Sequence, residues 1–129
     1  MSRRSSCPCG LPASYDDCCG RLHRGEVRAE TAERLMRSRY SAFTVQDADY
    51  LIRSWHPATR PAEVGFEPDL RWEGLEIIGT AAGGPSDTRG TVEFRAAFRQ
   101  GGQAGSLHEV SRFVRHDEGV WVYLKGNVT

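Results

Sequence analysis

The chain has 129 residues, which is enough for one domain with a small appendage. Lys and Arg together number 17, as do Asp and Glu, so the formal net charge is zero. This balance argues against nucleic acid or a membrane surface as the partner, because both favour proteins with a positive excess, and no apolar run approaches the roughly 18 residues of a membrane-spanning helix.

The amino-terminal segment carries every cysteine of the chain, at Cys7, Cys9, Cys18 and Cys19. Two closely spaced pairs of thiolates form a compact set of soft ligands, and such a set suits one tetrahedral metal ion. The sequence therefore predicts a Zn²⁺ site, with iron as the alternative ion.

Disulfide bonds are the alternative fate of these thiols. A bond between the adjacent Cys18 and Cys19 would be strained, and bonds between the two pairs are unusual in a reducing cell. Arg3 and Arg4 are not followed by an apolar segment, so we expect no secretory signal and a cytoplasmic protein. This location favours metal binding over disulfides.

Between the two cysteine pairs, the sequence predicts a turn that leads into a short helix. Ser14 is the candidate N-cap, and Asp16 and Asp17 lie in the acidic first turn. A helix this short is not stable alone, so we expect the metal to fold it. His23 is a further candidate ligand, but four cysteines already complete a tetrahedron, and we expect a solvated surface histidine.

Two helices are predicted next. The first begins after the N-cap Thr31 and has one apolar face, formed by Ala32, Leu35, Met36, Tyr40 and Phe43. On the remaining faces we expect arginines, at Arg34, Arg37 and Arg39.

The second helix begins near Asp47, after a short connection at 44–46, and ends before Pro57. Its expected buried residues are Ala48, Leu51, Ile52 and Trp55. These two helices should form an antiparallel pair.

The second half of the chain predicts four antiparallel strands. They cover residues 70–78, with a bulge at Gly74, and 91–99, 107–115 and 120–125, separated by a mobile loop at 79–90 and turns at 100–105 and 117–119. Two helices followed by a meander predict an α+β fold in which the helices cover one face of a curved sheet.

The cysteine segment resembles a known zinc motif. Cys7-Pro-Cys9-Gly, then Tyr15 and Cys18-Cys19-Gly, is similar to the SEC-C motif, best known from the carboxy-terminal tail of the SecA translocation ATPase, and keeps its ligand spacing. The motif usually carries Ser-Gly after its first glycine, where this chain has Leu-Pro, a change that alters the turn but removes no ligand.

The rest of the chain resembles the YchJ family of small bacterial proteins, in the stretches 35–43, 47–51, 55–57 and 107–113. The resemblance implies a SEC-C-like zinc motif at 1–25 and a cystatin-like α+β domain of the nuclear-transport-factor-2 type at 26–129. It implies a cone-shaped sheet with a pocket beneath it, but no assigned activity.

Polar side chains on the predicted strands and at the helix end form a second candidate site. The pocket candidates are His56, Glu93, His108, Glu109 and Arg112. Strand alternation sets His108 and Arg112 on one face and Glu109 on the other, and a histidine with a carboxylate can act as a general base. The alternative is that these residues form cross-strand ion pairs on a solvated face.

A zinc ion held by four cysteines keeps no open position for water, so its role is structural or in recognition. No catalytic motif accompanies it, and whether the chain is an enzyme stays open. Our leading hypothesis is an adaptor whose zinc-binding segment at 1–25, the knuckle, docks a protein partner. The alternatives are an enzyme or small-molecule binder that uses the cone pocket, and a knuckle that only stabilises the fold.

Overall fold

A computed structural model describes residues 6–128 of the chain. Four strands form one antiparallel sheet in the order β1-β2-β3-β4, so each strand pairs with its neighbour in sequence. Their bounds are β1 Leu70–Ala82, β2 Arg89–Gln100, β3 Gln103–His116 and β4 Val120–Val128. The predicted meander is confirmed.

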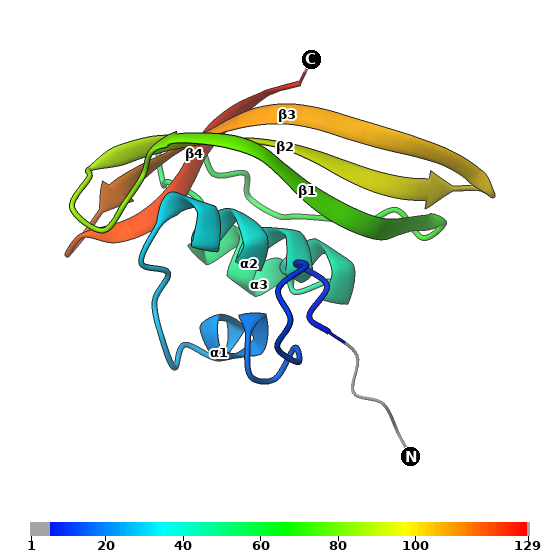
Figure 1. The fold of residues 1–129 in the computed structure, drawn as a ribbon, viewed down its shortest axis with the longest axis horizontal. Helices are drawn as coiled ribbons and strands as arrows, with labels where there is room; N and C mark the ends of the chain where they lie inside the picture. The colour runs from blue at the N-terminus through cyan, green and yellow to red at the C-terminus, as the bar shows by residue number, and fades with distance from the viewer. Residues whose placement is uncertain (1–5, 129) are drawn as a thin grey trace.

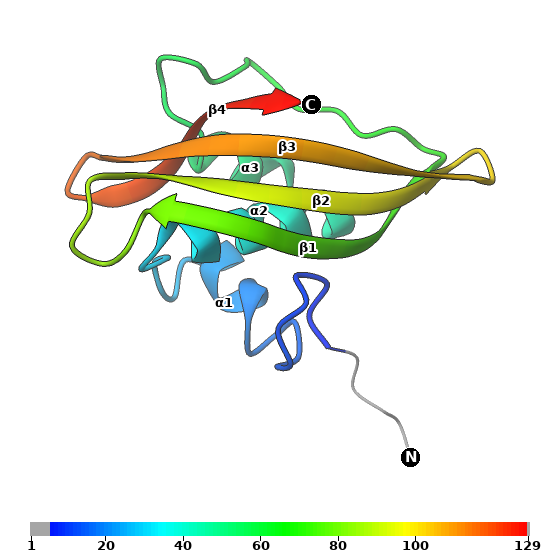
Figure 2. The same ribbon diagram turned by 45° about the horizontal axis from the view of Figure 1, so that its top comes forward.

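Three helices lie on one side of the sheet: α1 Cys19–His23, α2 Ala32–Val45 and α3 Ala48–Arg53. Helices α2 and α3 cover one face of the curved sheet, and α1 with the cysteine segment lies beyond α2, on its far side from the sheet (Figures 1 and 2). The predicted α+β class is confirmed. In the part of the chain that the structure describes, no helix is long and apolar enough to span a membrane.

Caps define the helix pair as the sequence predicts. The Thr31 hydroxyl accepts a hydrogen bond from the backbone N–H of Arg34 at 3.0 Å, and the Asp47 carboxylate accepts one from the N–H of Tyr50 at 3.0 Å. Between the helices, Gln46 adopts a left-handed conformation at φ 60°. The two helices are therefore joined by a single tight corner.

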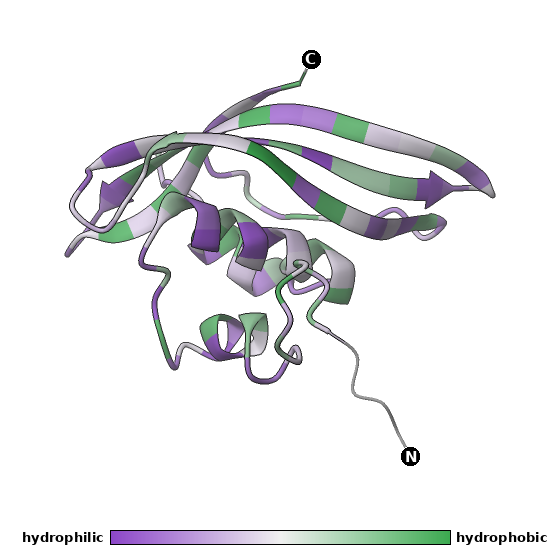
Figure 3. Ribbon diagram, viewed as in Figure 1, coloured by the Kyte–Doolittle hydropathy of each residue, from purple (hydrophilic) through white to green (hydrophobic). Residues whose placement is uncertain are grey.

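The apolar face of α2 packs against the sheet. Bands of hydrophobic and hydrophilic residues alternate along α2 and the strands (Figure 3), as expected for elements with one buried face. The core between the layers comprises Ala32, Leu35, Met36, Tyr40, Val92, Phe94, Ala96, Phe113 and Trp121.

Helix α3 is shorter than predicted. It ends at Arg53, and the next residues run parallel to β4, with the His56 N–H donating to the carbonyl of Tyr123 and the Tyr123 N–H to that of Ser54, both at 2.8 Å. Pairing with the sheet thus replaces the last helical turn before Pro57. Of the residues predicted to be buried in this helix, Leu51 is fully buried and Ile52 is only partly buried.

The predicted helix after Ser14 is wrong. Ser14 forms a β-bridge with Ser6, residues 15–18 form turns, and α1 begins at Cys19. The Ser14 hydroxyl does accept from the Asp17 N–H, at 3.3 Å. This local hydrogen bond closes a turn instead of starting a helix, an alternative that serine offers the backbone.

The strands extend further than predicted. The bulge beside Gly74 is confirmed, and a second register shift lies between Ile77 and Gly79. The predicted turn at 100–105 shrinks to Gly101 and Gly102, both with positive φ (57° and 87°). Consecutive left-handed residues match the twist of a tight hairpin, so the strands pair up to the turn.

A close backbone approach at the other end of β2 requires glycine. A Cβ at Gly90 would lie 2.4 Å from the Cα of Gly83. We expect Gly90→Ala to lower the free energy of unfolding by about 1–3 kcal/mol, because backbone must move to make room. Urea unfolding measures this change. The matched control is Gly79→Ala in β1, whose added Cβ meets nothing within 4 Å; equal losses in the two variants would contradict the prediction.

Candidate metal centre and cavity

A tight turn presents the first two cysteines. The Gly10 N–H donates to the carbonyl of Cys7 at 3.0 Å, and the Cys7 N–H to that of Ala13 at 2.8 Å. Gly10 takes φ 96°, a conformation that glycine adopts without strain. The turn therefore sets Cys7 and Cys9 side by side.

The second pair is positioned by the carbonyl of Tyr15. This carbonyl accepts from the N–H groups of Cys18 at 3.1 Å and Gly20 at 2.7 Å. A Cβ at Gly20 would lie 2.7 Å from the same oxygen, so only glycine allows the approach. The chain then enters α1 at Cys19.

The four sulfur atoms form one buried cluster. They lie within 4.8 Å of one another, the Sγ atoms of Cys9 and Cys18 are 3.7 Å apart, and none of the four cysteines is in a disulfide. Sulfurs bound at about 2.3 Å to a tetrahedral zinc are about 3.8 Å apart. The donor set therefore fits a single tetrahedral ion, and a closed one, since each cysteine is at most 6% exposed.

The second face of helix α2 holds this cluster. The Arg34 guanidinium donates to the sulfurs of Cys18 at 3.2 Å and Cys19 at 3.4 Å. Arg37 donates to the carbonyl of Cys9 at 2.6 Å and pairs with the Glu33 carboxylate at 3.0 Å.

The hydroxyl of Ser41, one turn further along α2, lies 3.4 Å from the sulfur of Cys7. The spacing of Arg34, Arg37 and Ser41 by three and four residues puts them on one face. Helix α2 is thus a platform with the sheet on one side and the sulfur cluster on the other.

The pKa values of the thiols shift in different directions. Hydrogen bonding to Cys9, with further hydrogen bonds from Ser41 and Arg34, lowers the pKa of Cys19 to about 4. The bond to Cys19 and burial raise the pKa of Cys9, and burial raises that of Cys18. Cys19 is therefore the thiol that loses its proton most readily, next to the positive charge of Arg34.

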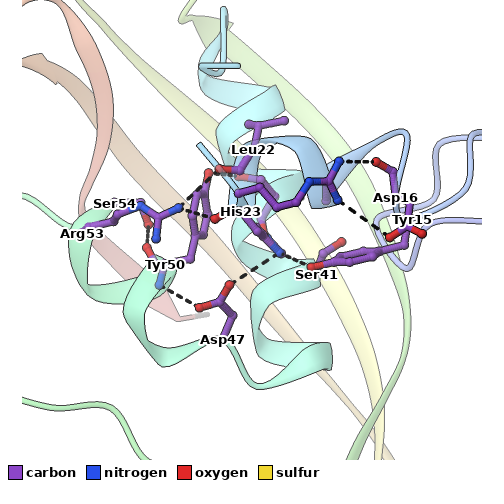
Figure 4. Close-up of polar contacts among 12 residues, drawn as sticks. Tyr15, Asp16, Leu22, His23, Ser41, Asp47, Tyr50, Arg53 and Ser54 are labelled. Atoms are coloured by element: carbon purple, nitrogen blue, oxygen red, sulfur yellow. Dashed lines mark hydrogen bonds and ion pairs between the residues drawn. The ribbon is translucent and has the colours of Figure 1, made fainter. Parts of the chain in front are cut away.

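His23 is not the surface residue that the sequence suggests. It is 8% exposed, and its ring joins Tyr15 OH at 2.6 Å to the Ser38 carbonyl at 2.9 Å. Asp47 lies 3.8 Å away, and Figure 4 shows the ring between residues of the knuckle, α2 and α3. His23 lies outside the sulfur cluster and connects the three helices.

Arg39 is the second residue that the sequence misplaces. Its side chain is 4% exposed, unlike Arg34 and Arg37, because it points under the sheet and not away from it. Tyr40 and Met36 on the same helix share that location.

A cavity of about 250 Å³ separates α2 from the concave face of the sheet. Its walls are apolar and aromatic, with a few polar groups from β3, β4 and α2. The lining residues are Met36, Arg39, Tyr40, Phe43, Trp55, Trp72, Phe94, Ala96, Leu107, Glu109, Ser111 and Tyr123.

The structure does not bring the five sequence-predicted pocket residues together. Glu109 lines the cavity, whereas His108 and Glu93 form a partly exposed hydrogen bond of 2.6 Å on the opposite face of the sheet. Arg112 lies on the face of β3 opposite Glu109 and is exposed. His56 lies outside the cavity, with its ring 4.7 Å from that of His116.

Three cavity residues with polar groups were not predicted from the sequence as pocket residues: Arg39, Trp55 and Tyr123. Arg39 lies beside Tyr40 at the edge of the predicted apolar face of α2. A charged residue at that edge is assigned to solvent by hydrophobic periodicity, so the pattern does not reveal its burial. The alternation of β3 was the usable signal, since it groups Glu109 with the buried Ser111 and Phe113.

Fold and cluster together define the class: an NTF2-like α+β domain carrying a SEC-C-type cysteine knuckle. The family described as "YchJ, middle NTF2-like domain" matches residues 31–126. A UPF0225 protein of Streptomyces coelicolor is 58% identical over 120 residues, which cover 93% of each chain. One of Bordetella pertussis is 49% identical over 132 residues, with 98% of this chain and 96% of that protein covered.

Two solved structures agree with this assignment. The solution structure of a SEC-C motif containing protein from Rhodopseudomonas palustris superposes with a TM-score of 0.82 at 34% identity, covering 97% of this chain and 99% of that one. The crystal structure of one from Psychrobacter arcticus gives 0.78 at 30% identity, with coverage of 97% and 83%. The chain belongs to the YchJ (UPF0225) family.

We expect His23→Ala to destabilise the protein by about 2–4 kcal/mol, because it leaves a cavity and removes both hydrogen bonds of a buried ring. Chemical denaturation measures the loss. His116→Ala, at an exposed histidine, is the control and should change stability by less than about 0.5 kcal/mol. A loss at position 23 no larger than at position 116 would show that His23 does not connect the helices.

Proposed function

We propose that this protein is a zinc-binding interaction protein, in which Cys7, Cys9, Cys18 and Cys19 hold one structural Zn²⁺. The observation that carries the proposal is the closed, buried cluster of four sulfurs within 4.8 Å. When bound, the ion cross-links the turn at Cys7 to the start of α1. With four protein ligands it leaves no position for a reacting water.

Charge compensation by Arg34 supports the metal site. Four thiolates and Zn²⁺ carry a formal charge of −2, which is costly in a buried position. Burial lowers the pKa of Arg34, but the hydrogen bond to Cys19 and the charges of the thiols raise it overall, so the guanidinium stays charged. Partners that donate to metal ligands hold them in place and contribute to affinity.

We expect one zinc per chain by elemental analysis and an Arg34→Met variant that binds zinc about 10–100-fold more weakly in chelator competition. Arg28→Met is the control, because Arg28 is exposed and contacts Glu118 instead of the cysteines. Protein purified from its native host without zinc, or holding iron, would overturn the metal assignment. Equal affinity of the two variants would overturn the role of Arg34.

The knuckle side of the molecule also supports partner docking. A groove of about 610 Å³ runs between the knuckle and the segment that leads into α2, and apolar side chains such as Leu11 and Val27 line it. Arg34 compensates the thiolates of the cluster, which leaves Arg21 and Arg28 as the exposed cations at the edge of the groove. A segment of a cytoplasmic protein partner with apolar side chains and an acidic group beside Arg21 or Arg28 fits this surface.

We expect the double variant Arg21→Glu, Arg28→Glu to lose proteins that the wild type captures, because it replaces both exposed cations at the edge of the groove with acidic groups. Both side chains are at least 50% exposed, so zinc content and stability should not change. Arg112→Glu, on the other face of the sheet, is the control. Quantitative pull-down measures the difference, and an unchanged set of captured proteins would leave the knuckle as a fold-stabilising clip only.

A second candidate function is favoured by the cavity beneath the sheet. A partly open cavity of about 250 Å³ with aromatic walls and a few convergent polar groups has the character of a site for a small ligand. Under this candidate the NTF2-like domain binds a ligand or acts on one, with Glu109 among the residues that touch it.

A further inference from the structure

We infer that the cavity binds a small, flat organic acid, with the carboxylate on Arg39 and the apolar body between the aromatic walls. This inference deepens the second candidate function above and rests on it. The cavity lies on the opposite side of helix α2 from the sulfur cluster, and none of the four cysteines lines it.

Arg39 is a buried cation held in one position. Its Nη1 donates to the carbonyl of Leu51 at 2.8 Å and to the hydroxyl of Ser54 at 2.7 Å. The guanidinium carbon lies 4.5 Å from the ring centroid of Tyr123 and 5.0 Å from that of Trp55. Two anchored hydrogen bonds and two aromatic contacts fix the plane of the guanidinium in advance of any ligand.

The remaining donors of this group have no acceptor. Both hydrogen bonds of the guanidinium use Nη1, and Nε and Nη2 donate to no residue within 6–128. No carboxylate oxygen among those residues lies within 4.0 Å of the Arg39 nitrogens. Burial lowers the pKa of Arg39 to about 10, so the group is still charged at neutral pH.

A neighbouring donor differs from those of Arg39. Within the described part of the chain, Trp55 Nε1 is the one fully buried side-chain nitrogen or oxygen without a hydrogen-bond partner. Its ring lines the cavity and contacts Arg39. The Trp55 N–H is closed off from the cavity, so a ligand can touch the ring but not this group. The partnerless donors of Arg39 are not among the fully buried atoms, and they face the open space of the cavity, where a carboxylate with two acceptor oxygens can pair with them.

Glu109 limits what that anion can be. Its carboxylate accepts from the Ser111 hydroxyl at 2.6 Å and from Tyr123 OH at 3.4 Å, so its charge is partly stabilised within the wall. Gly126 lies against it, where a Cβ would come into contact with its oxygens. A second negative charge in the same cavity excludes a doubly charged phosphate and tolerates a monoanion that sits on Arg39.

Size and wall chemistry set the rest of the ligand. A cavity of 150 Å³ holds benzene, so 250 Å³ holds about ten non-hydrogen atoms. The aromatic rings of Tyr40, Phe43, Trp72 and Phe94 favour a flat apolar body. Arginine binds a planar carboxylate through two parallel hydrogen bonds. Aromatic carboxylic acids of this size combine both requirements.

The test uses three probes of nearly identical shape: phenylacetate, phenylacetamide and phenethylammonium. Binding is followed by amide NMR titration of the zinc-loaded full chain. We expect phenylacetate to bind at least about tenfold more tightly than the amide, and the ammonium not to bind. The shifted signals should belong to residues that line the cavity.

Three variants assign the interaction to its residues. Arg39→Met should abolish the preference for phenylacetate over the amide. Glu109→Gln should strengthen phenylacetate binding several-fold and leave the amide unchanged, and this variant keeps the test valid if Arg39→Met does not fold. Ala96→Leu, which fills the cavity without changing charge, should weaken both probes.

The outcomes separate the inference from the function on which it rests. If acid and amide bind equally well in the cavity, or Glu109→Gln has no effect on their ratio, the carboxylate inference is wrong and ligand binding stands. If no probe shifts the signals of lining residues, both the inference and the second candidate function fall. Phenylacetate shifts that are the same in Ala96→Leu place the probe outside the cavity and overturn the inference.

Discussion

The structure depends on the contact between the Arg34 guanidinium and the sulfurs of Cys18 and Cys19. This contact attaches a segment that is too short to fold alone to a helix whose other face is fixed by the sheet. Helix α2 is covered on both sides: its polar face contacts the cysteine segment, and its apolar face packs against the sheet. The sulfur cluster and the cone domain are therefore one packed unit, although they read as two motifs in the sequence.

The prediction of secondary structure was strong where local chemistry decides it. The N-caps Thr31 and Asp47, the apolar stripe of α2 and the bulge at Gly74 follow from spacing and residue type alone. The helix after Ser14 failed because its serine closes a turn. The early end of α3 depends on backbone pairing with β4, a tertiary interaction that no local pattern reports.

The two candidate sites differ in how far their residues lie apart in the sequence. Four cysteines in a fixed spacing predicted their own proximity, since the segment that joins them is short. The cavity could not be predicted in this way, because Arg39, Glu109 and Tyr123 come from α2, β3 and β4 and meet only through the curvature of the sheet. His23 and Arg39 were misplaced for a common reason: sequence patterns assign ionisable residues to solvent unless a partner is visible nearby.

The strand-like segment at Ser54–His56 has a consequence for the behaviour of the whole sheet. An outer strand normally presents free N–H and C=O groups on which another chain can add a strand. The hydrogen bonds between this segment and Tyr123 occupy part of that side of β4, and two register shifts make β1 irregular on the other side. Addition of a further strand is therefore hindered at both borders of the sheet.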